Sequence, residues 1–452
     1  MTLSYSSALL TDAYQLSMMQ TYLENQMVDL AVFELYVRNL PRDRNFLIAA
    51  GIDPALDFLE NLHFTPDELQ WLKKTHRYSS SFLQYLKNFR FTGQVDGVLE
   101  GSIVFQNEPI LRITAPLPEA QFVESRLINI IQFQSMIASK AIRTHLVAQG
   151  RQILDFGLRR SHGAEAGIMA ARASYIAGFH GTSTVESARL YGIPYFGTMA
   201  HSFIQAHSSE ELAFERYALS QKSPVIFLID TYNIKNAALI VSKITPRLRA
   251  QGAQIQGVRI DSGNLIEESR AVRQILNQHH LEDLKIFVSG NLEEKAIEQI
   301  LQSQAPIDGF GVGTKLTTSS DAPYLECVYK LQEYAGELKQ KHSSGKVSLP
   351  GSKQIYRIMT PEGELTSDLL SLQSEPPPSP HPGALITPLL TTLMKHGKRS
   401  FTPEPLETIQ RRVLSQVSKL PEPLRALKQS PSPYPVTLST RLQHYAQKRS
   451  LT

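Results

Sequence analysis

The chain has very little cysteine and no long apolar segment. Its 452 residues include a single cysteine, Cys327, so an intrachain disulfide and a thiolate metal cluster are both excluded. No uninterrupted run of about 18 apolar residues occurs, and the start lacks the basic and apolar regions of a signal peptide. We therefore expect a cytoplasmic protein with no membrane partner.

Long blocks of like charge are missing as well. The formal net charge is only +4, which is small for this length. This charge argues neither for nor against a polyanion partner, and we expect no nucleic-acid partner. A composition of 42% hydrophobic and 19% charged residues is ordinary for a globular protein. Because 452 residues are many for one core, we expect two or more packed units.

Residues 1–125 predict a mixed α+β domain. Thr11 and Asp12 precede an amphipathic helix, and residues 31–37 alternate apolar and polar side chains as a half-buried strand does. Residues 65–68 have the signature of a capped helix start, with proline in the first turn. Short apolar runs and glycines between 91 and 114 predict a small antiparallel sheet.

Residues 126–330 predict a βα-repeat domain that follows a long apolar helix over about 119–149. Strand candidates recur about 30 residues apart, each followed by a helical pattern, which is the period of a βα unit. This domain is expected to be an irregular α/β barrel, with an open doubly wound sheet as the alternative. The strand candidates lie near Ile153, Tyr195, Val225, Val258, Ile286 and Phe310.

The pattern weakens in residues 331–452. A basic, glycine-containing loop over 339–353 is followed by a proline-rich stretch at 375–384, which predicts a stiff exposed connector. A helical and loop segment over 404–452 ends the sequence.

Charged residues and glycines follow several of the strand candidates. Arg259 and Asp261 are two residues apart, hence on the same side of a strand, where they form either a structural ion pair or a ligand site. The run Gly311-Val312-Gly313-Thr314-Lys315 offers backbone N–H groups, a hydroxyl and an ammonium to a phosphate, although a plain turn has the same composition.

His201 follows another strand candidate. A lone histidine there is either a structural hydrogen-bonding residue or a group that takes part in chemistry. His207 is six residues away, a spacing that does not align the two rings for a metal.

Taken together, these motifs resemble the nicotinate phosphoribosyltransferase family over nearly the whole chain, in the family's order. The motifs are Leu10-Thr11-Asp12-Ala13-Tyr14-Gln15, Phe156-Gly157-Leu158-Arg159-Arg160, Gly181-Thr182-Ser183, Gly197-Thr198-Met199-Ala200-His201-Ser202, Gly257-Val258-Arg259-Ile260-Asp261-Ser262-Gly263, Ile307-Asp308-Gly309-Phe310-Gly311-Val312-Gly313-Thr314, Val328-Tyr329-Lys330-Leu331 and Pro350-Gly351-Ser352-Lys353-Gln354-Ile355-Tyr356-Arg357.

The resemblance implies an irregular α/β barrel joined to an α+β domain built from the N-terminal and C-terminal segments. It also implies a head-to-tail homodimer with shared active sites. The implied reaction joins nicotinate to phosphoribosyl pyrophosphate in NAD salvage, giving nicotinate mononucleotide and pyrophosphate. ATP hydrolysis is coupled to this reaction, and Mg²⁺ is the implied cofactor.

The resemblance also assigns roles to residues. His201, Arg259 and Asp261 match catalytic positions, and His201 matches the histidine that ATP phosphorylates. Ser183 stands where relatives that use nicotinamide carry an acid, which favours nicotinate as substrate. The matched substrate-binding positions are Tyr14 (from the partner subunit) and Phe156, which hold the pyridine ring, together with Arg159, Arg160, Ser183, Thr198, Ser202, Ser289, Gly290, Asn291, Gly311, Gly313 and Thr314.

Two positions depart from the family pattern. Asn264 and Asn291 stand where acidic residues are common, and an amide cannot balance the charge of a magnesium ion. These asparagines leave open a non-catalytic sensor of nicotinate or phosphoribosyl pyrophosphate. Nicotinamide transfer and quinolinate transfer are alternatives within the same fold, and Ser183, His201 and the full-length match speak against both.

Overall fold

The computed structural model describes residues 7–340, 349–379 and 382–447, and the chain packs into two compact units. Unit 1 contains residues 1–139 and 322–452, and unit 2 contains residues 140–321. The boundaries expected from the sequence, at 125 and 330, fall inside a helix and a strand, α6 (Glu124–Val147) and β12 (Cys327–Tyr334).

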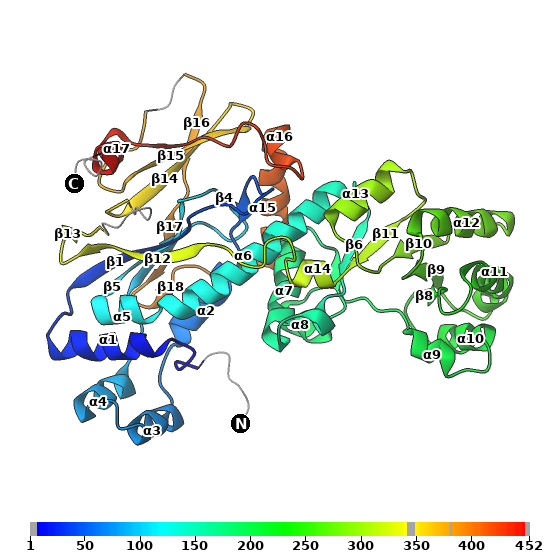
Figure 1. The fold of residues 1–452 in the computed structure, drawn as a ribbon, viewed down its shortest axis with the longest axis horizontal. Coiled ribbons are helices and arrows are strands. Elements are labelled where there is room, and N and C mark those ends of the chain that lie inside the picture. Colours follow the sequence, from blue (N-terminus) through cyan, green and yellow to red (C-terminus); the bar gives the residue numbers. More distant parts are fainter. Residues whose placement is uncertain (1–6, 341–348, 380–381, 448–452) are drawn as a thin grey trace. The chain divides into compact units, whose positions relative to one another are not determined.

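Unit 1 is built from sheets of mainly antiparallel strands (Figure 1). In the described residues the orders are β13-β12-β1-β5-β3-β17-β18, β16-β14-β15-β19 and β2-β4. The other strands of this unit are β1 (Leu30–Val37), β2 (Leu47–Ile48), β3 (Gln94–Gly97), β4 (Ile103–Val104), β5 (Pro109–Pro116), β13 (Glu337–Leu338), β14 (Lys353–Met359), β15 (Leu365–Leu372), β16 (Leu385–Pro388), β17 (Thr391–Lys395), β18 (Lys398–Arg399) and β19 (Val436–Leu438). Its helices, besides the first part of α6, are α1 (Ala13–Glu24), α2 (Ile52–Asn61), α3 (Pro66–Lys74), α4 (Ser80–Asn88), α5 (Leu117–Phe122), α15 (Leu406–Ser418), α16 (Glu422–Arg425) and α17 (Thr440–Gln447).

Several local predictions for unit 1 are confirmed. Thr65 and Glu68 form a reciprocal capping box at the start of α3, and β3 pairs with β5 in an antiparallel ladder. The long apolar helix is interrupted at Val123, between α5 and α6. The capped helix expected after Asp12 is present as α1, but Asp12 makes no side-chain cap hydrogen bond to it and instead accepts the hydroxyl of Ser125 at 2.6 Å.

One prediction for unit 1 is wrong. Residues 31–37 are buried throughout rather than alternately, because β1 lies between β12 and β5 inside the larger sheet. Strands β14 to β17 lie within 353–395, a region for which the sequence pattern predicted no strands. Residues 341–348 of the basic loop and 380–381 of the connector lie outside the described residues.

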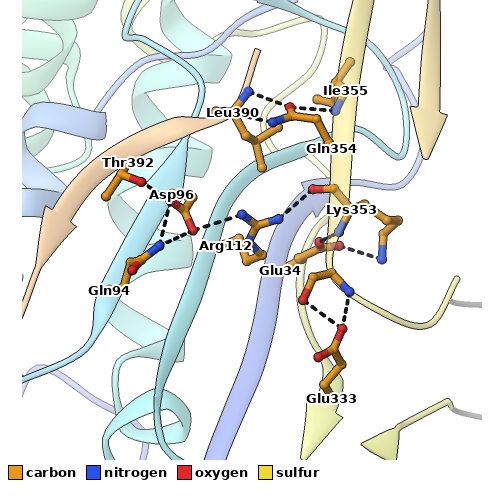
Figure 2. Close-up of polar contacts among 11 residues, drawn as sticks. Glu34, Gln94, Asp96, Arg112, Glu333, Lys353, Gln354, Ile355, Leu390 and Thr392 are labelled. Atoms are coloured by element: carbon orange, nitrogen blue, oxygen red, sulfur yellow. Dashed lines mark hydrogen bonds and ion pairs between the residues drawn. The ribbon is translucent and has the colours of Figure 1, made fainter. Parts of the chain in front are cut away.

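Buried charges connect β14 to the larger sheet. Figure 2 shows Lys353 between Glu34 and Arg112. Nζ of Lys353 lies 2.7 Å from Oε2 of Glu34, and Arg112 donates to the carbonyl oxygen of Lys353 at 2.8 Å. Arg112 also bonds Asp96 at 2.9 Å, and all four side chains are almost fully buried. A buried charge is tolerated only when it is paired. Lys353, in the late motif of the sequence, therefore serves the packing of unit 1.

A second buried group in unit 1 should make stability depend on pH. Burial and the nearby carboxylate of Asp368 hold the pKa of Glu108 well above its ordinary 4.5, and Arg357 only partly offsets them. Between these two pKa values the folded state retains a proton that the unfolded chain releases. The free energy of unfolding therefore falls as pH rises above about 4.5, by roughly 1.4 kcal/mol per pH unit, until the folded pKa is reached.

Glu108→Gln is expected to remove this loss, because an amide stays neutral while still accepting the N–H of Phe105. Urea-unfolding midpoints at pH 5 and pH 8 check this: relative to wild type, the variant should gain stability as pH rises. Glu362→Gln, at an exposed position of the same unit, is the matched control. A difference from wild type that does not change with pH would contradict the expectation.

Unit 2 is a mixed α/β structure around one parallel sheet of half-barrel form. Its strands pair in the order β7-β6-β11-β10-β9-β8, and Ile153, Val258, Ile286 and Phe310 are fully buried. The strands are β6 (Gln152–Asp155), β7 (Gly181–Thr182), β8 (Val225–Leu228), β9 (Ile255–Ile260), β10 (Lys285–Val288) and β11 (Gly309–Val312). The helices, besides the end of α6, are η1 (Leu158–Arg160), α7 (Ala164–Ile176), α8 (Val185–Tyr191), α9 (His201–Gln205), α10 (Glu210–Ser220), α11 (Ile234–Ala250), α12 (Leu265–Gln278), α13 (Glu294–Gln302) and α14 (Thr314–Thr317).

The strand predicted near Tyr195 is absent from the described residues of unit 2, where Tyr195 makes an isolated bridge to Thr182. The short strand β7 occupies that part of the sheet instead, and its two residues are too few to leave an apolar run in the sequence. None of the described helices combines the length and apolarity that crossing a bilayer requires.

Candidate active site

Parallel strands of unit 2 end together at one edge of the sheet. The register pairs Asp155 with Val312, and pairs Val288 with both Phe310 and Ile260. The residues that follow β6, β11, β10 and β9 therefore leave the sheet at the same edge, which is where α/β folds place their ligands. Most of the predicted site residues lie there.

Asp155, the last residue of β6, organises two segments of this edge. Its buried carboxylate accepts the N–H of Gly157 at 2.8 Å and the hydroxyl of Thr182 at 2.7 Å, while its carbonyl oxygen accepts the N–H of Ser183 at 2.8 Å. Burial raises the pKa of Asp155 to about 6, and the two hydrogen bonds oppose that rise. Asp155 thus fixes the Phe156 turn relative to Ser183.

The ring of Phe156 lies against the backbone of β11. A Cβ on Gly311 would be 2.5 Å from two ring atoms, so only glycine fits this position. On β9, Cζ of Arg259 lies over the same ring, 6.0 Å from its centroid, at the limit of a cation–π contact. The structure thus brings Phe156, Gly311 and Arg259 together.

Arg259 retains an unused donor. Its Nη2 is 3.5 Å from the carbonyl oxygen of Met199, whereas its buried Nε has no hydrogen-bond partner in the part of the chain that the structure describes. Burial lowers the pKa of Arg259, and the charges of Asp261 and Asp230 oppose that shift. Asp261 accepts its own hydrogen bond from the hydroxyl of Ser289. A buried donor without a partner is what an absent anionic ligand would leave behind.

His201 is oriented by an acid that follows β8. Its Nε2 lies 3.2 Å from Oδ1 of Asp230, whose side chain is 1% exposed against 40% for the histidine. Asp230 is itself held by the hydroxyl of Ser262 at 2.6 Å and by the N–H of Asp261 at 3.2 Å. Because a carboxylate accepts, Nε2 donates this hydrogen bond, and Nδ1 is the ring nitrogen that does not face Asp230. Thr198 and Ser202, on either side of His201, are half-buried and exposed.

The turns after β10 and β11 approach the site with backbone rather than side chains. Gly290 has φ +96°, and a Cβ there would lie 2.1 Å from the carbonyl oxygen of Asp261. Asn291 follows with φ +51°, and a Cβ on Gly313 would be 2.9 Å from the carbonyl oxygen of Phe156. Thr314 begins α14. Turns of this kind present N–H groups that suit an anion.

The remaining predicted residues make other contacts. Arg159 and Arg160 are exposed on η1, and the charge of Arg159 acts on Arg259. Tyr14 belongs to unit 1, on α1, where its hydroxyl is 3.3 Å from Oε2 of Glu124. The ammonium of Lys315 is 2.8 Å from Oε1 of Glu293.

The two asparagine departures have structural explanations. Oδ1 of Asn264 caps α12 by accepting the N–H groups of Ile266 at 3.2 Å and Glu267 at 3.4 Å. Asn291 adopts the left-handed conformation that asparagine tolerates better than most residues. Asparagine is suited to both positions.

The residues suit a magnesium ion only if substrate phosphates supply most of its ligands. The described residues contain no cluster of three or more His, Cys, Asp or Glu side chains placed to hold a metal. Mg²⁺ commonly takes one or two carboxylates and completes its shell with phosphate oxygens and water. Asp261 is the carboxylate available for this, because the oxygens of Asp230 already accept three hydrogen bonds.

Three residues of the cluster were not predicted from the sequence: Asp155, Thr182 and Asp230. Asp155 and Asp230 both end apolar runs, and that signal alone could have marked them. Their contacts cross 27 to 32 residues of sequence, so nothing local identified their partners.

The site lies at the strand ends of a parallel half-barrel. It combines turns whose backbone N–H groups suit an anion with an arginine and an oriented histidine. These features define a phosphate-handling α/β enzyme. The family models for the N-terminal domain, the family proper and the C-terminal domain of nicotinate phosphoribosyltransferase match residues 9–132, 151–370 and 352–446. The chain therefore belongs to the nicotinate phosphoribosyltransferase family, as the resemblance of its motifs indicated.

Curated relatives and a solved structure agree. The chain is 41% identical over 436 residues to nicotinate phosphoribosyltransferase pncB2 of Mycobacterium tuberculosis, covering 96% of this chain and 92% of the relative. It is 36% identical over 366 residues to the nicotinate phosphoribosyltransferase of Bacillus subtilis, covering 78% and 74%. The crystal structure of human nicotinic acid phosphoribosyltransferase superimposes with a TM-score of 0.85 at 26% identity, covering 97% of this chain and 99% of the human chain.

Proposed function

We propose that this chain joins nicotinate to phosphoribosyl pyrophosphate, giving nicotinate mononucleotide and pyrophosphate for NAD salvage. The observation that supports this most directly is the grouping at one sheet edge of Phe156, Arg259 and the turns at Gly290 and Gly313. An aromatic face suits a pyridine ring, and a cation beside backbone N–H groups suits phosphates.

In the proposed reaction the ring nitrogen of nicotinate attacks C1 of the ribose. The C1–O bond breaks, and pyrophosphate leaves with the bonding electrons. Negative charge grows on the leaving group, so Arg259, Arg159 and Arg160 stabilise the transition state. Asp261 would supply a carboxylate to a Mg²⁺ ion brought by the pyrophosphate, and such an ion would neutralise part of the same charge.

Ser183 would select the acid over the amide. It is half-buried and held by Asp155 beside the Phe156 turn. A neutral hydroxyl can donate a hydrogen bond to the carboxylate of nicotinate, whereas an acid at this position would repel it. We therefore propose nicotinate, and neither nicotinamide nor quinolinate, as the substrate.

ATP coupling would pass through His201. Nδ1, the nitrogen that does not face Asp230, attacks the γ-phosphorus of ATP; the bond to the bridging oxygen breaks, and ADP leaves. Water later takes the phosphoryl group, which restores histidine and releases phosphate. The phosphohistidine would add negative charge next to Arg259 and the turn at Asp261, and so change the affinity for the sugar pyrophosphate.

Two further features belong to the proposal. The enzyme would act as a homodimer in which Tyr14 completes the pyridine site of the other copy, a role suited to a side chain that is 49% exposed. It would act in the cytoplasm, where a thiol such as Cys327 stays reduced. Burial raises the pKa of that thiol to about 12, so it is unreactive.

The test is product formation from labelled nicotinate with phosphoribosyl pyrophosphate and magnesium, with and without ATP. We expect ATP-stimulated nicotinate mononucleotide, with nicotinamide and quinolinate giving little product. Binding of both substrates without turnover would instead indicate a sensor. A preference for nicotinamide or quinolinate would contradict the assignment of Ser183.

A further inference from the structure

A network of buried charges in unit 2 includes residues next to the turns after β10 and β11, which contain Gly290 and Gly313. None of its members is among the residues assigned to the substrates. Its members come from the end of α6, the start of α13, α14 and the last residue of the unit. Three are cations and three are anions: Lys140, Arg143, Lys315, Glu293, Glu294 and Asp321.

Lys140 is the centre of this network. Its side chain is 1% exposed, and its Nζ lies 2.7 Å from Oε2 of Glu294, 2.8 Å from Oδ1 of Asp321 and 3.8 Å from Oε2 of Glu293. Arg143 holds the other oxygen of Glu294 at 3.0 Å. Burial would raise the pKa of Glu294, but Lys140 and Arg143 outweigh it and lower that pKa. The inner part of the network is therefore ionised and fixed.

Glu293 connects this fixed centre to both turns. It follows Asn291 by two residues, and its Oε1 accepts from Nζ of Lys315, which follows Gly313 by two residues. Glu293 occupies the N-cap position of α13 without making a side-chain cap hydrogen bond. Glutamate is not a preferred N-cap residue, so helix capping does not explain it. Its carboxylate is engaged in the contact between the turns.

The turns themselves leave little room for movement. A Cβ on Gly290 or Gly313 would collide with the backbone of Asp261 or Phe156, so neither turn can move toward those residues. A ligand site held by a second layer of fixed groups needs no rearrangement when the ligand binds.

We propose that Glu293 and Lys315 are positioning residues that lock the turns after β10 and β11 to each other and to Lys140, so that their backbone N–H groups are preorganised for the phosphates of phosphoribosyl pyrophosphate. The inference rests on the proposed function. It assigns Lys315 a role through Glu293 rather than as a phosphate ligand of its own.

Glu293→Gln tests the inference, because the amide keeps the shape but removes the charge that holds Lys315 and faces Lys140. We expect the KM for phosphoribosyl pyrophosphate to rise by about ten- to a hundredfold. An effect of this size is expected when the backbone N–H groups of the two turns move slightly out of position. The KM for nicotinate should change less than about twofold, because Ser183 and the Phe156 turn are held by Asp155 instead.

Glu298→Gln on the same helix is the matched control and should leave both KM values unchanged. Lys315→Met should reproduce the effect of Glu293→Gln, and the double variant should be no worse than either single variant, since one contact is lost in all three. Lys315→Arg, which keeps the charge that Lys315→Met removes, should retain most of the wild-type affinity for phosphoribosyl pyrophosphate. The residues changed are 24% and 30% exposed, so the variants are expected to fold, and thermal unfolding checks this.

Three results would overturn the inference. In the first, Glu293→Gln leaves the KM for phosphoribosyl pyrophosphate unchanged. In the second, the double variant raises this KM well beyond Glu293→Gln, which would make Lys315 a direct ligand. In the third, Glu293→Gln weakens nicotinate equally.

Calorimetric titration with phosphoribosyl pyrophosphate and magnesium, without nicotinate, separates this inference from the proposed function. If the wild-type protein binds phosphoribosyl pyrophosphate but forms no product, the proposed function is contradicted. The difference in affinity between wild type and Glu293→Gln then still tests the role of the network. If the wild-type protein does not bind phosphoribosyl pyrophosphate, both the proposed function and the inference are contradicted.

Discussion

Replacing Arg259 with methionine is expected to lower kcat/KM for phosphoribosyl pyrophosphate by about a thousandfold. The side chain carries a charge and a buried Nε donor without a partner in the described residues, beside Phe156 and Asp261. Removing one preorganised donor from developing negative charge costs about 10² to 10³ in rate, and here the charge is lost as well. Steady-state kinetics with nicotinate at saturation measures the effect.

Lysine at the same position should recover only part of the activity. It restores the charge but offers a single point donor where arginine presents a planar fork that includes Nε. Arg216→Met removes an exposed arginine from α10 and is the matched control, with no expected change. Activity of Arg259→Met within about tenfold of wild type would show that the leaving group is stabilised elsewhere.

The predictability of the fold depended on how local each signal is. The capping box at Thr65 and Glu68 joins groups three residues apart, so the sequence revealed it. The burial of β1 depends on pairing with residues 327–334, about 300 positions later, and no periodicity in β1 reports that. The strands after residue 353 were missed because buried charges such as Lys353 and Arg357 interrupt their apolar pattern.

Prediction of the site followed the same rule. The glycines at 290, 311 and 313 could be predicted as site residues because they lie in glycine motifs at strand ends. In the structure Gly290 and Gly313 pack closely against backbone atoms, and Gly311 packs against the ring of Phe156. Which acid holds His201 could not be predicted, because Asp230 follows β8 and makes its contact across 29 residues. The network around Lys140 joins α6 to residues more than 150 positions later, which no motif encodes.

Replacing His201 with alanine is expected to abolish ATP hydrolysis while slow, ATP-independent formation of nicotinate mononucleotide remains. Nδ1 is the nucleophile in the proposed coupling, and no other atom of the side chain can replace it. The pyridine and phosphate groups of the site, by contrast, are held by Phe156, Arg259 and the two turns, none of which depends on the imidazole. Parallel assays of ADP and of labelled product measure the two activities separately.

His207→Ala is the matched control for this prediction. His207 lies six residues later, where its Nδ1 contacts the carbonyl oxygen of Phe203 at 2.7 Å, so its loss removes an imidazole without touching Asp230. Asp230→Asn should reduce ATP hydrolysis less severely than His201→Ala, because an amide can still bond Nε2 but cannot stabilise a positive ring. Equal loss of ATP hydrolysis and of ATP-independent product in His201→Ala would argue against a phosphohistidine and make His201 a residue of the transfer step itself.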